Sequence, residues 1–387
     1  MNITSLKSVL GRKFRGASLD DVQGISDYSL FAEAASNLLG NIDPIETIKR
    51  KELFIYKDVF DYAPEADMKK IVDIRPQVNR NYSDNFSRSF IEDFDRTKED
   101  KKFAIEFDNG VKVLRISREV GTALQMDSCN DLDTWSVGGG ASNLEEDDYI
   151  TAGGGSLMFD LGLTGGYIEN SGYDVDLSGY EDQSSFFIAV YIPDPTIVTN
   201  AFLFWGDDNA NYWSKTITTP HFGSFRIGWN LLRFDWDGAT EVGTPTPANF
   251  DYLRFGFTTT STETKVRIDD IWLRKPVMHD VLYYSRYLFR NTAGTFLTAP
   301  TSDDDMINLE SDAENLFVNE CCILIADGLT RAEDAQKYTN ALYGTAQKPG
   351  LYANYKASKP AEPIRPQTNL RPIKRIRQFG GGFRKQK

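Results

Sequence analysis

Residues 184–205 read SSFFIAVYIPDPTIVTNAFLFW, and the prediction of the fold starts from this stretch. Two apolar runs, Ser184–Tyr191 and Ala201–Trp205, are rich in β-branched and aromatic residues and flank a segment with two prolines. Runs of about 5–8 such residues that end at turn-forming residues are typical of β-strands. The stretch therefore predicts two short strands.

Three more runs of this kind follow toward the C-terminus, at Asn230–Trp236, Tyr252–Thr258 and Lys265–Leu273. Gly, Asn, Asp or Pro residues separate the runs, and helix signals are absent. Many short strands with turn signals between them indicate a β-sandwich or jelly roll, and about 150 residues suit one domain. We therefore expect a jelly-roll β-sandwich over residues 121–275.

The segments on both sides of this domain carry helical patterns. Apolar residues recur every three or four positions from Tyr28 to Ile42, which predicts one amphipathic helix. Capping-box spacings begin at Ser311 and Thr330, each ahead of an apolar stripe. These two helices have a very short connection, so we expect an antiparallel α-hairpin.

One further signal before the sandwich is the dipeptide Asn109-Gly110 between two alternating apolar runs, which predicts a β-hairpin. The chain is thus predicted to be an α+β multidomain protein. Its jelly roll is inserted into a small, mostly helical body, the first part formed by residues 26–120 and the second part by residues 276–348.

Both ends of the chain are expected to be extended arms. Residues 1–25 are predicted to be an N-terminal arm, and residues 349–387 a basic, proline-rich C-terminal arm that cannot form a helix or an inner strand. The last stretch, 351–387, has ten basic residues and one acidic residue. Such asymmetry usually marks an interaction tail, and the alternative is a solvated end. The residues expected to contact DNA or a protein surface are Lys374, Arg375, Arg377, Arg384 and Lys385.

Charge is distributed unevenly along the chain, whose formal net charge is −13. Residues 121–270 contain 23 acidic and 6 basic residues, so the sandwich carries −17 and the remainder +4. No run of about 18 apolar residues is present, which argues against a membrane-spanning segment. The three cysteines form no zinc or disulfide pattern, and we expect folding in a reducing cytoplasm.

Motifs for catalysis are also missing from the sequence. There is no G-x-S-x-G elbow, no phosphate-binding G-x-x-x-x-G-K-[S/T] loop and no H-E-x-x-H pair. The sandwich has about two dozen acids, so a pair of carboxylates with glycosidase spacing is expected by chance. We therefore expect the protein not to be an enzyme and to use no cofactor, with a structural calcium ion as the one exception considered.

Exposed aromatic residues are the better candidates for a ligand site in the sandwich. Aromatic faces stack on sugar rings, so Tyr212, Trp213 and Trp205 are candidate glycan contacts, and the alternative is that they fill the core. Asp270, near the end of the last strand, and Asp127, near the first, are candidate calcium ligands, because Ca²⁺ binds six to eight oxygens. The alternative for both is a solvated surface carboxylate.

Two resemblances to known families extend these expectations. The segments DLDTW, GSLMFDL, DLSGYEDQSSFFIAVYIPD, GWNLLRFDW and RIDDIWL occur in an order that resembles jelly-roll carbohydrate-binding modules. That family has a structural calcium ion near the first and last strands, and the resemblance implies Asp270 as a ligand. It also implies glycans as partners of the sandwich.

The flanking segments resemble structural proteins of tailed bacteriophages, of the neck or head-to-tail connector type. DYSLFAEAASNLLGNIDP, VDIRPQVNR, LYYSRYLFRNTAGTF and YANYKASKPAEPIRPQT carry this resemblance. It implies a homo-oligomeric ring in the virion, made in the host cytoplasm, that docks to the portal and to other neck or tail proteins. The sequence therefore supports a connector (adaptor) subunit with an outward sandwich, and the alternative is a carbohydrate-binding protein.

Overall fold

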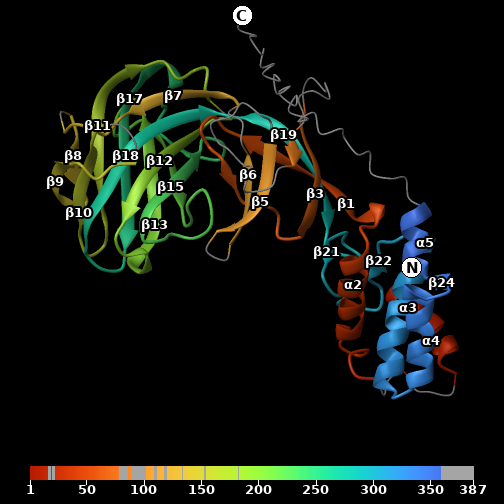
Figure 1. Ribbon diagram of the computed structural model, residues 1–387. Helices are drawn as coiled ribbons and strands as arrows, with labels where there is room; N and C mark the ends of the chain where they lie inside the picture. Colours follow the sequence, from red (N-terminus) through yellow and green to blue (C-terminus); the bar gives the residue numbers. More distant parts are fainter. Residues whose placement is uncertain are drawn as a thin grey trace, which may run out of the picture. The chain divides into compact units, whose positions relative to one another are not determined.

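The structure is a computed structural model that describes residues 1–15, 19, 22–77, 86–88, 102–108, 111–116, 120–132, 134–151, 154–181 and 183–358 (Figure 1). The chain divides into two compact units. Met1–Thr47 and the chain from Arg286 onward form unit 1, and Ile48–Ser285 form unit 2. No helix in the described part of the chain is long and apolar enough to cross a membrane.

The larger part of unit 2 is a β-sandwich of two six-stranded antiparallel sheets, which confirms the predicted sandwich. Sheet I has the order β15-β12-β18-β10-β9, and β7 also pairs with β18. Its strands are β7 Thr122–Asp127, β9 Ser142–Asp147, β10 Ser156–Leu161, β12 Ser185–Ile192, β15 Gly228–Asp235 and β18 Glu263–Lys275. Sheet II has the order β16-β14-β13-β17-β11-β8. Its strands are β8 Ser136–Gly138, β11 Gly166–Val175, β13 Val198–Gly206, β14 Tyr212–Ile217, β16 Thr240–Val242 and β17 Phe250–Thr259.

Alternation along the strands fills the space between the two sheets. In β12, Phe186, Ile188 and Val190 belong to the sandwich core, and in β13 Leu203 and Trp205 meet them from the other sheet. Successive side chains on a strand point to opposite faces, so the residues between these lie on the outer faces of the sandwich. The functional surfaces of the domain are therefore built from the other half of each strand.

A smaller β-region adjoins the sandwich in unit 2, where the sequence predicted a mostly helical body. One sheet has the order β1-β19-β3 and another β2-β6-β5-β4. Their strands are β1 Ile48–Ile55, β2 Asp61–Tyr62, β3 Met68–Pro76, β4 Ser87–Arg88, β5 Lys102–Asp108, β6 Val111–Ile116 and β19 Val277–Ser285. The hairpin of β5 and β6 is as predicted from Asn109-Gly110. Residues 26–120 were predicted to be a helical and β-hairpin body. The hairpin is present, but the helical part extends only over Ser29–Asn41, because period-two runs that are far apart in the sequence pair through β19.

Unit 1 contains the helices, which come from both ends of the chain (Figure 1). They are α1 Ile3–Lys13, α2 Ser29–Asn41, α3 Ser311–Gly328, α4 Ala332–Tyr343 and α5 Leu351–Ser358. Short strands complete the unit: β20 Phe289–Arg290, β21 Phe296–Leu297, β22 Met306–Ile307, β23 Gly344–Thr345 and β24 Lys348–Pro349. The predicted helices from Tyr28 onward and from Ser311 and Thr330 correspond to α2, α3 and α4.

Two segments predicted as arms are helices that pack into unit 1. The N-terminal segment forms α1, where the Asn2 side chain caps the helix by accepting from Ser5 N at 2.9 Å, and where Leu6 and Leu10 are buried. The start of the C-terminal segment forms α5, which buries Tyr352 and Tyr355. The buried residues Ile3, Leu6 and Leu10 recur every three or four positions, a helical period that the prediction did not use, and in α5 the buried pair Tyr352 and Tyr355 is three residues apart. The five basic residues Lys374, Arg375, Arg377, Arg384 and Lys385 lie outside the described residues.

The anchor of α5 is a buried carboxylate on α3. Glu320 is 2% exposed and accepts from Tyr352 OH at 2.6 Å and from Tyr343 OH at 3.1 Å. We expect Tyr352→Phe to lower the free energy of unfolding by about 1–3 kcal/mol, because a buried carboxylate loses a donor. Tyr343→Phe is the matched control and should cost less, because Tyr343 is 52% exposed. Equal losses in urea unfolding of the two variants would contradict this account.

A buried histidine joins the sandwich to the smaller β-region. His221 follows β14, donates from Nε2 to the Asp61 carbonyl at 2.9 Å, and packs edge-on against Tyr62 and Phe187. Burial, followed by the nearby Arg233, lowers the pKa of His221 from 6.5 to about 4. The imidazole is therefore neutral in the folded protein at neutral pH.

This pKa shift predicts acid sensitivity. The unfolded chain binds a proton at His221 below about pH 6.5 and the folded chain only below about pH 4, so stability is lost as the pH falls through this window. His221→Gln removes the titration. We expect the stability advantage of the unmodified chain over this variant to shrink by about 2 kcal/mol between pH 7 and pH 5 in urea unfolding. A constant difference would show that His221 is accessible to protons in the folded state.

Candidate functional site

Two of the three predicted glycan contacts lie in the sandwich core. Trp205 is fully buried, and its ring centroid is 5.1 Å from that of Phe186 and 5.7 Å from that of Trp236. Trp213 is 8% exposed, with its centroid 5.1 Å from that of Trp236. Neither ring has a face open to a ligand, so the structure corrects the prediction for both residues. Tyr212 differs, because it lies half-buried on the outer face of sheet II.

The two predicted calcium ligands lie on neighbouring strands, but their surroundings do not fit a calcium site. The Asp127 carboxylate accepts from Cys129 N at 2.7 Å, from Tyr173 OH at 2.9 Å and from Asn170 Nδ2 at 3.1 Å. Asp270 Oδ1 accepts from Gln125 Nε2 at 2.8 Å. Among the described residues no group of three or more His, Cys, Asp or Glu could hold a metal ion. Asp127 acts instead as a hydrogen-bond hub inside the domain.

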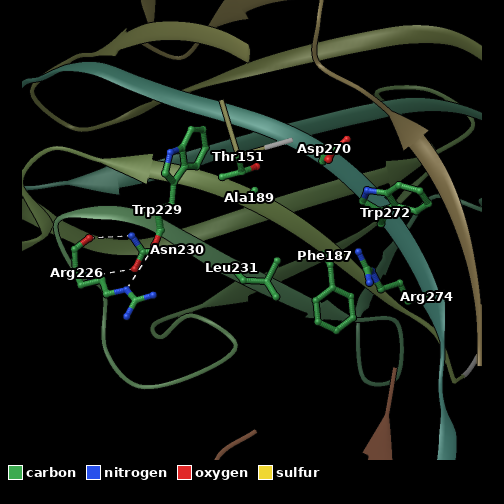
Figure 2. Close-up of a pocket in the computed structure, with 10 residues that line it drawn as sticks. All are labelled: Thr151, Phe187, Ala189, Arg226, Trp229, Asn230, Leu231, Asp270, Trp272 and Arg274. Atoms are coloured by element: carbon green, nitrogen blue, oxygen red, sulfur yellow. Dashed lines mark hydrogen bonds between the residues drawn. The ribbon is translucent and has the colours of Figure 1, made fainter. Parts of the chain in front are cut away.

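A pocket of about 310 Å³ lies on the outer face of sheet I (Figure 2). Its apolar lining comes from β12, β15 and β18, which are adjacent in the sheet. Phe187, Ala189, Leu231, Trp229 and Trp272 supply these apolar side chains. Polar groups lie around them, from Thr151, Arg226, Asn230, Asp270 and Arg274. An apolar depression with a few polar groups is the usual composition of a small-molecule site.

The two tryptophans mark the length of the pocket. Trp229 is paired with Tyr191 of β12, and Trp272 is paired with Phe187 of the same strand. These β12 positions are four residues apart, which corresponds to about 13 Å along a strand. The two indole rings therefore lie at opposite ends of an elongated site, as Figure 2 shows.

A cluster of aromatic rings builds the Trp229 end of the pocket. Tyr149 lies nearly parallel to Trp229 at 6.1 Å between centroids, and Tyr191 lies edge-on to both rings. The Arg267 guanidinium carbon lies 5.1 Å from the centroids of both tyrosines, and its Nη2 is 2.8 Å from the Asp147 carboxylate. Tyr149 is 51% exposed, so the cluster is held firmly and still presents an aromatic surface.

A tight turn places Arg226 and Trp229 at the pocket. Asn230 is 4% exposed; its Oδ1 accepts from Arg226 N at 3.0 Å, and its Nδ2 donates to the carbonyls of Arg226 and Gly228 at 2.8 Å each (Figure 2). The amide thus satisfies three backbone groups and fixes the loop before β15. The exposed Arg226 can donate hydrogen bonds to a ligand in a rigid fork geometry.

Asp270 lies at an irregularity of β18. The register with β12 shifts between Ile188 and Ala189, so Asp270 is the extra residue, and its φ of 49° is left-handed. A bulge redirects a side chain, and such backbone strain is frequent at functional sites. Here the half-buried carboxylate lines the pocket. Burial, followed by the neighbouring Asp269, raises the pKa of Asp270.

The adjacent Asp269 has a supporting role. It is fully buried, and its Oδ2 accepts from Thr151 N at 2.7 Å and from Thr151 Oγ1 at 2.8 Å. These bonds fix the segment between β9 and β10 beside the pocket. Asp269 therefore fixes the loop through Thr151, whereas Asp270 lines the pocket.

The sequence contained a signal for the pocket tryptophans that our prediction did not use. In β15, Leu232 and Phe234 fill the core, so Trp229 has the same parity as the polar Arg233 and Asp235 and belongs to the outer face. Trp272 likewise lies between the core residues Ile271 and Leu273. Parity relative to core neighbours would have distinguished these rings from Trp205 and Trp213. The shift at Asp270 has no comparable sequence signal.

The left-handed backbone conformation of Asp270 predicts that this residue lowers the free energy of unfolding of the domain. Asp270→Gly should raise the free energy of unfolding by about 1 kcal/mol, because glycine adopts positive φ without a Cβ penalty. Asp270→Asn is the matched control: it removes the charge beside Asp269 and retains the side chain. Chemical unfolding measures both variants, and a glycine variant no more stable than the asparagine variant would contradict backbone strain at this position.

Comparison with known proteins gives similarity to solved structures alone. No family model matches the chain, and a search of curated proteins finds no match. A family 11 carbohydrate-binding module from Clostridium thermocellum, in complex with a β-1,3-1,4-mixed-linked tetrasaccharide, shares 15% identity with a TM-score of 0.31, over 40% of this chain and 96% of that chain. A family 30 carbohydrate-binding module of a Clostridium thermocellum cellulosomal cellulase shares 14% identity with a TM-score of 0.31, over 39% and 96%. The enzymatically active domain of bacteriophage CBA120 tailspike protein 4 shares 11% identity with a TM-score of 0.24, over 39% and 20%. The functional argument therefore rests on the pocket itself.

Proposed function

We propose that this protein binds a glycan in the pocket on the outer face of sheet I, without a chemical step. The observation that carries the proposal is the placement of Trp229 and Trp272 at opposite ends of one elongated, apolar-floored pocket. Two tryptophans that pair with β12 positions about 13 Å apart along the strand suit an oligosaccharide better than a compact metabolite.

The polar groups of the pocket suit a ligand with many hydroxyls. Asp270 offers carboxylate oxygens that accept from sugar hydroxyls, Arg226 offers guanidinium donors, and Thr151 Oγ1, whose proton is donated to Asp269, can still accept. Apolar C–H faces of a sugar ring and its hydroxyl edge require this combination of aromatic rings and a few fixed polar groups. A purely apolar ligand would leave the Asp270 carboxylate without compensation for lost water.

The test is a titration of the full chain with a panel of soluble oligosaccharides, followed by tryptophan fluorescence or calorimetry. We expect Trp229→Ala to weaken binding by about tenfold to a hundredfold, because it removes one aromatic end of the pocket. Leu163→Ala is the matched control, since Leu163 is 67% exposed and does not line the pocket. Binding that is equally strong in both variants, or no binding to any glycan, would remove the proposal.

A structural role in a phage particle is the second candidate, and a different observation favours it. The helices of unit 1 come from both chain ends, and the whole of unit 2 is inserted between Thr47 and Arg286. This arrangement suits a helical anchor that displays a sandwich. The candidate role is a neck or connector ring subunit of the virion that docks to the portal, with the basic residues after Ser358 contacting DNA or protein.

The oligomeric state tests this second candidate. A ring subunit should give a molar mass in light scattering that is a multiple of 43.7 kDa. Removal of residues 359–387 should then weaken assembly with a portal, or nucleic-acid binding at low salt. A monomer that binds neither would exclude the connector role and leave glycan binding unaffected.

A further inference from the structure

The Asp270 carboxylate is fixed in place at one end of the pocket on sheet I. It belongs to β18, two positions before Trp272, and both residues line the pocket. Its Oδ1 accepts from Gln125 Nε2 at 2.8 Å, and Gln125 of β7 is the strand partner of Trp272. The register of β18 is irregular against both neighbouring strands at this point. A bulge and a hydrogen bond from the next strand therefore hold the carboxylate beside the Trp272 ring.

The negative charge of Asp270 is not neutralised by the charged groups around it. The adjacent Asp269 is also an acid, and Arg274, further along β18, is paired with Asp58 at 3.7 Å. Burial, followed by Asp269, raises the pKa of Asp270, and hydrogen bonds from the Gln125 and Trp272 side chains oppose this shift only in part. A raised pKa means that the surroundings disfavour the charged form. A second negative charge brought to this end of the pocket would increase that cost.

The opposite end of the pocket has a positive group. Arg226 lies in the turn before Trp229, whereas Asp270 lies beside Trp272, as Figure 2 shows. The nearby Arg267 does not add to this charge, because its Nη2 is 2.8 Å from the Asp147 carboxylate. The pocket is therefore electrostatically asymmetric along its length, with a carboxylate near one tryptophan and a guanidinium near the other.

We propose that Asp270 selects the ligand of the pocket by charge: it admits a sugar unit with free hydroxyls at the Trp272 end and rejects a unit that carries a carboxylate there. The inference rests on the proposed function. An ionised carboxylate only accepts hydrogen bonds, so a hydroxyl can donate to Asp270 and a uronate carboxylate cannot. The uronate also meets like-charge repulsion in a half-buried place, and an unpaired charge of this kind is an effective means of rejecting a wrong ligand.

The experiment compares neutral and acidic forms of one oligosaccharide on the full chain. Calorimetry at pH 7 gives the affinities for cellotetraose and for its C6-oxidised form, which carries a carboxylate on every sugar. Maltotetraose and its C6-oxidised form are a second pair, so the comparison does not depend on one linkage. We expect the unmodified chain to prefer the neutral form by about tenfold or more, because one acidic unit must lie at Asp270.

Three variants locate the origin of this preference. Asp270→Asn should reduce it to about threefold or less, because the amide is uncharged and can donate to a carboxylate. Arg226→Gln should increase the preference, because it removes the positive charge at the other end. Glu241→Gln is the matched control: it removes one exposed acid from β16 of the other sheet, outside the pocket, and should leave the preference unchanged. If Asp270→Asn does not fold, Asp270→Gly replaces it, since glycine suits the left-handed backbone.

The outcomes separate the selection from the binding itself. Equal affinity of the unmodified chain for the neutral and oxidised forms, or a full preference retained by Asp270→Asn, would overturn the selection and leave glycan binding intact. A Glu241→Gln variant that relaxes the preference as much as Asp270→Asn would assign it to the net charge of the sandwich and would also overturn the proposal. If no variant binds either pair, and the oligosaccharide panel finds no ligand, the proposed function is lost and the selection with it.

Discussion

The contacts that bury Phe187 join the sandwich to the smaller β-region of unit 2. Phe187 belongs to the outer half of β12 and yet is fully buried, because Tyr56 lies over it at 4.9 Å, His221 at 5.4 Å and the Arg274 guanidinium at 5.4 Å. The smaller β-region thereby covers one end of the outer face of sheet I. At the other end Tyr149, rather than the smaller β-region, packs on Tyr191 and Trp229, and the pocket lies between these two ends.

This partial cover gives the pocket its form. Without this cover the outer face of sheet I would be flat. The residues packed over Phe187 close one end of it. Two polar groups beside Phe187 form hydrogen bonds: Arg274 donates to the Lys57 carbonyl, and Tyr56 OH is 3.0 Å from Ser185 Oγ. Because a buried unpaired donor costs about 1–3 kcal/mol, these bonds favour one arrangement of the two β-regions and so one shape of the site.

The sequence was sufficient for the parts of the fold that depend on local periodicity. The strands at Ser184–Tyr191 and Tyr252–Thr258 and the helix from Tyr28 follow from alternation or a 3.6-residue period, and the structure has them. It was insufficient where pairing is distant. β19 joins strands more than two hundred residues earlier in the chain, as in the pair Leu53 and His279, and no local pattern specifies such a partner.

The candidate site was predicted less well, for a physical reason. Trp205 and Trp213 were predicted as glycan contacts although parity faces them inward, whereas Trp229 and Trp272, which face outward, were not predicted. Comparing the parity of Trp229 with that of Leu232, and the parity of Trp272 with that of Leu273, would have assigned both tryptophans to the outer face. The position of Asp270 could not be predicted, because it depends on a register shift that only the pairing of β18 with two neighbours reveals.

Two of the few cations of the acidic sandwich hold aromatic rings in place on its outer faces. Arg267 on sheet I and Arg254 on sheet II each contact two or more aromatic rings and each pair with a carboxylate, Asp147 and Glu169 respectively. On each outer face this ion pair cancels the charge of the arginine beside the rings, and on sheet I the Asp270 carboxylate still lines the pocket. A neutral, hydroxyl-rich chain loses nothing to charge repulsion at such places, and a polyanion or a second copy of the domain meets the field of the remaining carboxylates. The charge distribution and the rings around the pocket are therefore both compatible with the uncharged glycan that we propose as its ligand.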